Sequence, residues 1–246
     1  MNRSLHFGEG LFETILWKEN NPKIPLHYKR LSGSARFLSI PCPDYETFLA
    51  QITAAVGGGG CDEKKYVKYL LYSEGGKGFW QRAEGFRWEV IVRELPSRPS
   101  RVSLCISPYG RHSADPVARH KTISYLFNVI VRREACERGF DDGIVLNERG
   151  EVCEVSSANV IIVKGSRLLT PSRDCGLLYG TTLEYLSSRI EVVEERLTAE
   201  DLFSADGVFV INSIMGAVRV ESIEGKRIKV DTDAEADILR ALEDVL

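Results

Sequence analysis

A polar segment near the middle of the chain, YGRHSADPVARH at residues 109–120, separates two stretches that each contain several apolar runs. It holds few apolar residues and one proline, which is typical of a connection between domains. We therefore predict two domains, residues 1–108 and 119–246, joined by residues 109–118. Each is long enough to bury its own core, and a cleft between two domains is a common place for a ligand site.

The N-terminal half is predicted to mix helices and strands, as an α+β domain. Apolar residues recur with a helical period in residues 25–40 and 44–56, and the glycines at 57–60 are expected to end the second helix. Segments rich in β-branched and aromatic residues indicate strands. These lie at residues 11–17, 65–73, 86–95 and 101–108.

The C-terminal half is predicted to be an α/β domain. A helix is expected over residues 122–138, because Ile123, Leu126 and Ile130 can share an apolar face and Gly139 can end it. The apolar runs GIVLN and NVIIV, around the turn ERGE, indicate a β-hairpin. Further strands are expected at residues 190–195 and 207–211, and further helices at 182–188, from Thr198 and from Asp233.

Charge and hydropathy exclude several functional classes. The formal net charge of −3 at pH 7 gives no clustered basic excess of the kind that binds nucleic acid. No apolar run approaches the roughly 18 residues that a membrane span needs, and the first residues lack the apolar core of a signal peptide. We therefore expect a cytoplasmic protein with no nucleic-acid or membrane partner.

The cysteines and histidines predict no metal site. None of the six cysteines forms a C-x-x-C pair, and the four histidines lack the spacing of metal ligands. We expect reduced thiols rather than a disulfide framework. The cysteines are Cys42, Cys61, Cys105, Cys136, Cys153 and Cys175.

Lys121 stands in a basic cluster with Arg119 and His120, at the start of the helix predicted over residues 122–138. The positive end of the helix dipole and the Arg119 charge would weaken the hold of Lys121 on its proton. A neutral lysine amine is what Schiff-base chemistry requires. The alternative is a solvated lysine at a frayed helix end, which the spacing alone favours.

Other polar residues stand where ligands often bind but where ordinary structure also needs polar groups. Glu154 lies between a hairpin turn and an apolar strand, so it is either partly buried with a partner or exposed on the turn. Thr181 and Thr182 follow Gly180 at a predicted helix start, which can bind an anion or simply be capped.

Three further candidates have equally ordinary alternatives. Asn212 and Ser213 end a buried strand, where a ligand or a plain turn is expected. Arg30, one turn after His27 on its helix, would by default be a surface arginine. Each pattern is weak alone, and the order of all of them along the chain is more informative.

Six ordered blocks span most of the sequence: HFGEGLFETI, HYKRLSGSARFLSI, HKTISYL, EACERGFDDGIVLNERGEVCEVSSANVIIV, LLTPSRDCGLLYGTT and FVINSIMGAVRV. Together these blocks resemble the class IV, fold-type IV pyridoxal-phosphate enzymes. This family includes branched-chain and D-amino-acid aminotransferases and 4-amino-4-deoxychorismate lyase. The resemblance implies an α/β fold of the D-amino-acid aminotransferase type, with most of the cofactor site in the C-terminal domain, and a homodimer.

The resemblance also implies roles toward pyridoxal phosphate. Lys121 matches the lysine that binds the cofactor covalently and moves the substrate proton. Glu154 matches the carboxylate that bonds the pyridine nitrogen, and Arg30 matches the phosphate-binding arginine. Phosphate contacts are further implied for Thr181, Thr182, Asn212 and Ser213, and packing on the ring is implied for Leu178.

The segments NSIMG and GGKGF are similar to the lyase subgroup. This implies conversion of 4-amino-4-deoxychorismate to 4-aminobenzoate and pyruvate, a step of folate biosynthesis. The alternative is a pyridoxal-phosphate-dependent class IV aminotransferase acting on a branched-chain or D-amino acid with 2-oxoglutarate. A non-catalytic relative is a third reading, against which the joint presence of Lys121, Glu154 and Arg30 argues.

Residues facing the small-molecule amino substrate are suggested by departures from the family pattern. Tyr72 occupies a position that is often arginine, a candidate for holding the substrate carboxylate, and Lys77 is the other candidate. Leu5 stands where D-amino-acid aminotransferases have an active-site tyrosine. Tyr125, shortly after Lys121, could reach the cofactor or could be a core residue.

Overall fold

The computed structural model describes residues 1–57 and 64–246, which form two compact units. Unit 1 comprises residues 1–97, 120–125 and 245, and unit 2 comprises residues 98–119, 126–244 and 246. The glycines at 58–60 that were expected to end a helix, and Cys61, lie outside the described residues.

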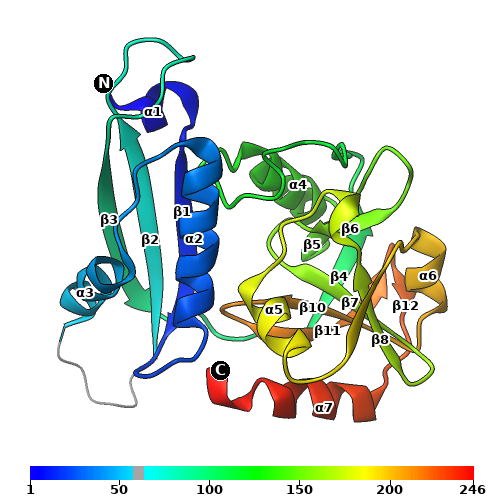
Figure 1. Cartoon of the computed structure of the whole chain (residues 1–246). Helices are drawn as coiled ribbons and strands as arrows, with labels where there is room; N and C mark the ends of the chain where they lie inside the picture. The colour runs from blue at the N-terminus through cyan, green and yellow to red at the C-terminus, as the bar shows by residue number, and fades with distance from the viewer. Residues whose placement is uncertain (58–63) are drawn as a thin grey trace. The chain divides into compact units, whose positions relative to one another are not determined.

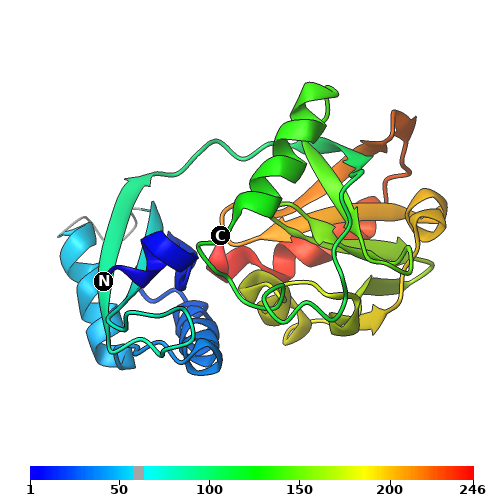
Figure 2. The ribbon, with the colours of Figure 1, turned by 90° about the horizontal axis from the view of Figure 1, so that it is seen from above.

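Unit 1 combines, in its described residues, a three-stranded antiparallel sheet with helices on one face. Its elements are α1 (Arg3–Phe7), β1 (Gly10–Trp17), α2 (Ile24–Leu38), α3 (Tyr45–Val56), β2 (Lys65–Glu74) and β3 (Gly85–Glu94). The strands follow the order β1-β2-β3, and α2 and α3 pack on the same face (Figures 1 and 2). The two long helices and the three strands confirm the prediction for this part of the chain.

Glu13 introduces a charge into the core of unit 1. Side chains alternate along β1, so that Leu11, Glu13 and Ile15 point to the face that α2 and α3 cover, whereas Phe12 points to the opposite face. The Glu13 side chain is fully buried. A buried carboxylate requires hydrogen-bonding partners, and α2 supplies them.

Residues 120–125 pair with the outer edge of β1 instead of opening a helix. The N–H of Phe12 donates to the carbonyl of Lys121 at 2.9 Å. The following helix, α4 (Leu126–Glu137), begins only after this segment, so the prediction of a helix from residue 122 is wrong at its start. An edge strand offers unpaired backbone groups, and pairing with them holds the segment extended. Lys121 is therefore not at a helix N-terminus, and the dipole argument for its amine does not apply.

Unit 2 is built on a nine-stranded mixed sheet. The strands are β4 (Arg101–Ile106), β5 (Asp142–Leu146), β6 (Val152–Val155), β7 (Asn159–Lys164), β8 (Arg167–Pro171), β9 (Val192–Glu195), β10 (Gly207–Asn212), β11 (Gly216–Ile223) and β12 (Lys226–Arg227). Their order is β6-β5-β4-β11-β10-β7-β8-β9, with β12 paired to β11. Apolar residues from most of these strands form the main core of the unit.

The helices of unit 2 pack around this sheet. Besides α4 they are α5 (Thr181–Ser187), α6 (Ala199–Ser204) and α7 (Thr232–Ala241), with short 3-10 turns at Arg173–Cys175 and Glu243–Val245. The predicted start of α6 is confirmed: the side chain of Thr198 caps the N–H of Asp201, and the Asp201 carboxylate accepts from the N–H of Thr198. Among the described residues, no helix is long and apolar enough to cross a membrane.

Two predictions about strand partners are wrong. The sequence predicts the strand at 101–108 in the N-terminal domain, but β4 pairs in parallel with β5 and β11 of unit 2. The turn ERGE joins β5 to β6, whereas β7 pairs with β8 and β10. The expected boundary at residue 108 therefore differs from the observed one after Ser97. A strand pattern in the sequence reports local conformation and does not identify the partner strand.

Candidate functional site

The candidate residues fall into two groups, one in each unit. Unit 1 carries Arg30, Tyr72, Lys77 and Lys121. Unit 2 carries the other six, Glu154, Leu178, Thr181, Thr182, Asn212 and Ser213.

The amine of Lys121 lies against aromatic rings of unit 1. Its Nζ is 4.5 Å from the centre of the Phe12 ring and 5.6 Å from that of Tyr125. The two rings meet edge to face, with their centres 5.2 Å apart. This packing fixes the direction of a half-buried lysine. Tyr125 thus contacts the candidate lysine and also packs against Phe12.

A second lysine, which sequence reasoning missed, shares the Phe12 ring. The Nζ of Lys68 on β2 is also 4.5 Å from the ring centre. Burial, together with the charge of Arg93, lowers the pKa of Lys68. The register pairs Lys68 with Thr14 and Leu70 with Phe12, so strand alternation places Lys68 on the face of Phe12. That alternation was visible in the sequence and could have identified it.

Arg30 is not a surface arginine. Its Nε and Nη2 donate to the two carboxylate oxygens of Glu13 at 2.8 and 2.5 Å, and Nδ1 of His27 lies 2.7 Å from Glu13 Oε2. Burial alone would raise the pKa of Glu13, but the charge and hydrogen bonds of Arg30 and the bond with His27 bring it down to about 2. A two-point ion pair of this kind fixes the plane of the guanidinium.

His27 completes this buried set as a neutral donor. Burial lowers the pKa of His27 to about 4, although Glu13 acts in the opposite direction. At neutral pH the ring is uncharged, so Nδ1 carries a hydrogen and donates it to Glu13. Arg30 therefore supplies the single positive charge that balances Glu13 within this set of three.

The two candidates for the substrate carboxylate differ in their surroundings. The hydroxyl of Tyr72 donates to Glu89 Oε2 at 2.8 Å. Burial and the neighbouring Glu89 raise the pKa of Tyr72 to about 12, so the phenol stays protonated. Lys77 is exposed in the loop between β2 and β3. Tyr72 pairs with Gly10 in the register, which places it on the same sheet face as Lys68.

In unit 2, Glu154 is nearly buried and has a charged partner. Nη1 of Arg111 donates to Glu154 Oε1, and the N–H of Leu178 donates to Oε2 at 3.3 Å. The side chains of Arg111 and Glu154 are only 10% and 8% exposed, so this pair is not a surface contact. Of the two alternatives for Glu154, burial with a partner is the one observed.

Arg111 is a candidate site residue that no sequence pattern distinguishes. It belongs to the polar segment that was predicted to connect the domains. In the structure its N–H donates to the carbonyl of Leu146 at 3.0 Å, and its guanidinium lies 4.9 Å from the Phe127 ring centre. A charged residue in a polar segment is usually solvated, and only the tertiary contacts show otherwise.

Thr181, Thr182 and Ser213 bring three hydroxyls together, and we call them the hydroxyl cluster. Ser213 Oγ lies 3.0 Å from Thr181 Oγ1 and 3.5 Å from Thr182 Oγ1. Both threonines are buried at the start of α5, and Ser213 lies in the turn between β10 and β11. Gly180 precedes them with its N–H bonded to Asn159 Oδ1 at 2.9 Å.

Asn212 shapes the turn that carries Ser213. Its Oδ1 accepts from the N–H groups of Ile214 and Met215 at 3.0 and 2.8 Å, and its Nδ2 donates to the carbonyl of Ser157 at 3.2 Å. These bonds occupy the side-chain amide in the turn itself. The contribution of Asn212 in this structure is the conformation of the turn.

The chemistry of these groups fits a phosphorylated aromatic aldehyde such as pyridoxal phosphate. Clustered hydroxyls and an arginine can donate hydrogen bonds to a phosphate, and a lysine amine can form a covalent bond with an aldehyde. A carboxylate held by an arginine can pair with a ring nitrogen. Leu178, whose N–H contacts Glu154, offers an apolar side chain beside that carboxylate.

Comparison with known proteins agrees with this chemistry. The family model described as amino-transferase class IV matches residues 10–223. The aminodeoxychorismate lyase of Vibrio harveyi is 28% identical over 94% of this chain and 89% of its own length. The branched-chain-amino-acid aminotransferase of Escherichia coli K12 is 26% identical over 92% of this chain and 79% of its own length.

A solved structure extends the similarity to the fold. The PLP-bound form of a hypothetical aminotransferase from Mycobacterium tuberculosis superposes with a TM-score of 0.85. It is 25% identical, and the match covers 100% of this chain and 92% of that one. The match therefore spans both units of this chain, and a protein with the same fold binds pyridoxal phosphate.

Proposed function

Because this chain belongs to the class IV aminotransferase family, with its mixed α/β fold of fold-type IV, we propose that it is a pyridoxal-phosphate-dependent lyase. It would convert 4-amino-4-deoxychorismate to 4-aminobenzoate and pyruvate. The observation that carries the proposal is the similarity to the Vibrio harveyi lyase over 94% of the chain, together with the lyase-like segments NSIMG and GGKGF.

Most of the candidate residues would have a part in this reaction, and Asn212 would shape the turn that carries Ser213. Pyridoxal phosphate, when bound, supplies an aldehyde for the substrate amine and an electron-accepting ring. Glu154, fixed by Arg111, would bond the ring nitrogen. Arg30 and the hydroxyl cluster would bind the phosphate, and Leu178 would pack on the ring.

Lys121 would carry the proton that the reaction moves. Its amine would take a proton from the substrate carbon that bears the amino group and return one to the departing enolpyruvyl carbon. The Phe12 and Tyr125 rings direct the amine. Loss of the enolpyruvyl group leaves an aromatic ring, which provides the driving force.

Lys68 is added to the candidates for the substrate carboxylates. Its ammonium lies as close to the Phe12 ring as that of Lys121 does. A cation that packs on the same aromatic ring as Lys121 suits a substrate that carries two carboxylates. Tyr72, on the same face, would contribute a neutral hydroxyl, and Lys77 would act from the neighbouring loop.

A branched-chain or D-amino-acid aminotransferase is the second candidate function, which the similarity to the Escherichia coli branched-chain enzyme favours. One experiment separates the two. The purified protein is incubated with aminodeoxychorismate and, separately, with amino donors and 2-oxoglutarate. Release of pyruvate and 4-aminobenzoate without glutamate is expected. Formation of glutamate alone would replace the lyase by the aminotransferase.

We also propose a homodimer, with contacts from α1 and the loop between β2 and β3. Leu5, Phe79 and Trp80 are 82%, 74% and 76% exposed on these two segments. Buried Arg3 ties the segments together by donating to the carbonyls of Gly78 and Phe79 at 2.9 and 3.3 Å. Large apolar side chains on a fixed surface mark protein contacts.

The dimer proposal predicts the effect of removing one aromatic side chain. Trp80→Ser is expected to convert the dimer to a monomer in light scattering after gel filtration, because interfaces depend on a few large aromatic residues. Trp88→Ser, at a 45% exposed tryptophan on β3, is the matched control and should leave the dimer intact. A monomeric wild-type protein, or an unchanged Trp80→Ser dimer, would contradict this contact.

A further inference from the structure

The residues that follow α7 contact both elements that carry the hydroxyl cluster. Asp244 Oδ2 accepts from the hydroxyl of Tyr185 on α5 and from Arg189 Nη2, each at 2.6 Å. Leu246 packs on Gly216, where the turn after β10 ends. A Cβ built at Gly216 would lie 2.6 Å from Leu246 Cδ1. One short segment of chain therefore holds α5 and the turn together.

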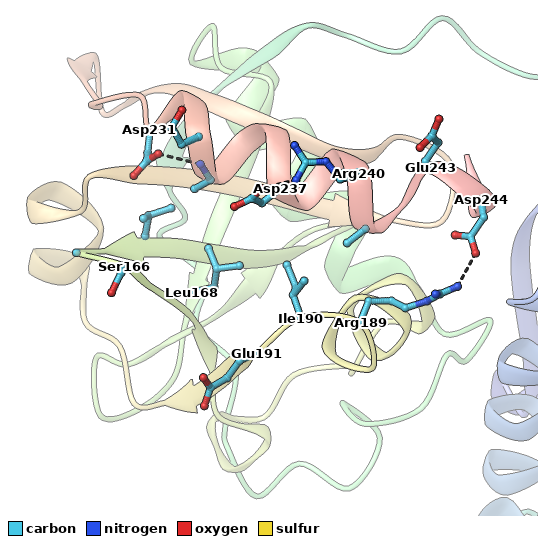
Figure 3. Close-up of a pocket in the computed structure, with 15 residues that line it drawn as sticks. Ser166, Leu168, Arg189, Ile190, Glu191, Asp231, Asp237, Arg240, Glu243 and Asp244 are labelled. Carbon is cyan, nitrogen blue, oxygen red and sulfur yellow. Dashed lines mark hydrogen bonds and ion pairs between the residues drawn. The ribbon is translucent and has the colours of Figure 1, made fainter.

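The bonds to α5 form a small charged network. Arg189 Nε also donates to the Tyr185 hydroxyl at 3.1 Å, so each of the three groups contacts the other two. Charge-assisted bonds of this kind are stronger than neutral ones. Arg189 and Asp244 line a cavity of about 980 Å³. Figure 3 shows them joined at one end of it.

The network contacts α5 on the same side as Thr181, a member of the hydroxyl cluster. Thr181 and Tyr185 are four residues apart on one helix, so their side chains lie on the same side of α5. Tyr185 is nearly buried, and its hydroxyl is fixed by Asp244. A rotation of α5 that moved Thr181 away from Ser213 would have to break this bond.

Leu246 packs against the turn that carries Ser213, the other part of the hydroxyl cluster. Gly216 has a φ of +65°, in the left-handed region that favours glycine, and it ends the turn in which Ser213 lies. The Leu246 side chain occupies the space where a Cβ of residue 216 would be. The turn that presents Ser213 is thus packed from one side by the same segment that holds Tyr185.

We propose that Asp244 and Leu246 are positioning residues for the phosphate of the cofactor. By holding α5 and the turn after β10, they keep the hydroxyls of Thr181, Thr182 and Ser213 at the mutual distances that bind a phosphate. The inference rests on the proposed pyridoxal-phosphate function. Affinity for the phosphate would then depend on the segment after α7, although this segment contributes no hydroxyl to the cluster.

Asp244→Asn tests this, with Asp237→Asn as its matched control. Asp237 lines the same cavity, but it pairs with Arg240 of its own helix and has no bond to α5. Dissociation constants are measured for pyridoxal phosphate and for pyridoxal, which lacks the phosphate. Asp244→Asn should raise the dissociation constant for pyridoxal phosphate by about five- to tenfold. The dissociation constant for pyridoxal should change by less than about twofold. Asp237→Asn should change neither.

If Asp244 had only a structural role, Asp244→Asn would weaken the binding of both ligands equally, and that result would overturn the inference. So would an Asp244→Asn protein that binds pyridoxal phosphate as tightly as the wild type. Leu246→Ala provides the second variant, with the same selective loss expected. A wild-type protein with no affinity for pyridoxal phosphate would overturn the proposed function, and the inference with it. If the wild-type protein bound pyridoxal phosphate but the variants lost affinity for both ligands equally, the inference would be overturned and the proposed function would stand.

Discussion

Lys121→Ala is expected to lower kcat for the proposed lyase reaction by about 10²- to 10⁴-fold, since it removes the group proposed to move the proton. The variant should also lose covalent attachment of the cofactor. After borohydride treatment, wild-type protein loaded with pyridoxal phosphate should carry the pyridoxyl group on the peptide that contains Lys121. Mass spectrometry of a digest measures this directly.

Lys68→Met is the matched control, because the amines of Lys68 and Lys121 lie at the same distance from the Phe12 ring. It should retain the pyridoxyl label on Lys121 and raise KM for the substrate by about tenfold through loss of a carboxylate contact. A label on Lys68, or on any other lysine, would show that the catalytic amine has been misassigned.

The sequence identified Lys121 as a candidate by an argument that the structure does not support. Apolar periodicity continues from Ile123 into α4 and predicts a helix from residue 122, whose dipole would act on Lys121. Periodicity is local, whereas residues 120–125 are held extended by bonds to β1. The position of the lysine was implied by the resemblance, and its surroundings came only from the tertiary structure.

The same limit explains which parts of the fold could be predicted. Segments such as α2, α3 and β2 carry strong patterns, and they appear where expected. The pairing of β4 with β5 and β11 could not be predicted, because distant segments decide it. Lys68 could have been predicted to lie beside Phe12 from the alternation of side chains along the strands. Arg111 was not, since nothing in a polar connecting segment distinguishes a buried arginine from a solvated one.

Acidification is expected to destabilise unit 1 through His27 before Glu13 is protonated. Burial lowers the pKa of His27 from 6.5 to about 4. Between these values the unfolded chain binds more protons than the folded protein, so the free energy of unfolding falls as the pH falls. A shift of this size corresponds to roughly 3 kcal/mol. The contribution of Glu13, whose pKa is lowered from 4.5 to about 2, is lost only below pH 4.5.

Denaturant unfolding at a series of pH values measures this dependence, and His27→Asn isolates its source. The asparagine amide can replace the donor to Glu13 but does not titrate, so the slope between pH 6.5 and 4.5 should nearly disappear. His6→Asn, at an exposed histidine, should leave the slope unchanged. If His27→Asn kept the wild-type slope, the buried imidazole would not be neutral. Arg30 would then share the balancing of Glu13 with a second positive charge, which would leave its guanidinium less firmly held for a phosphate.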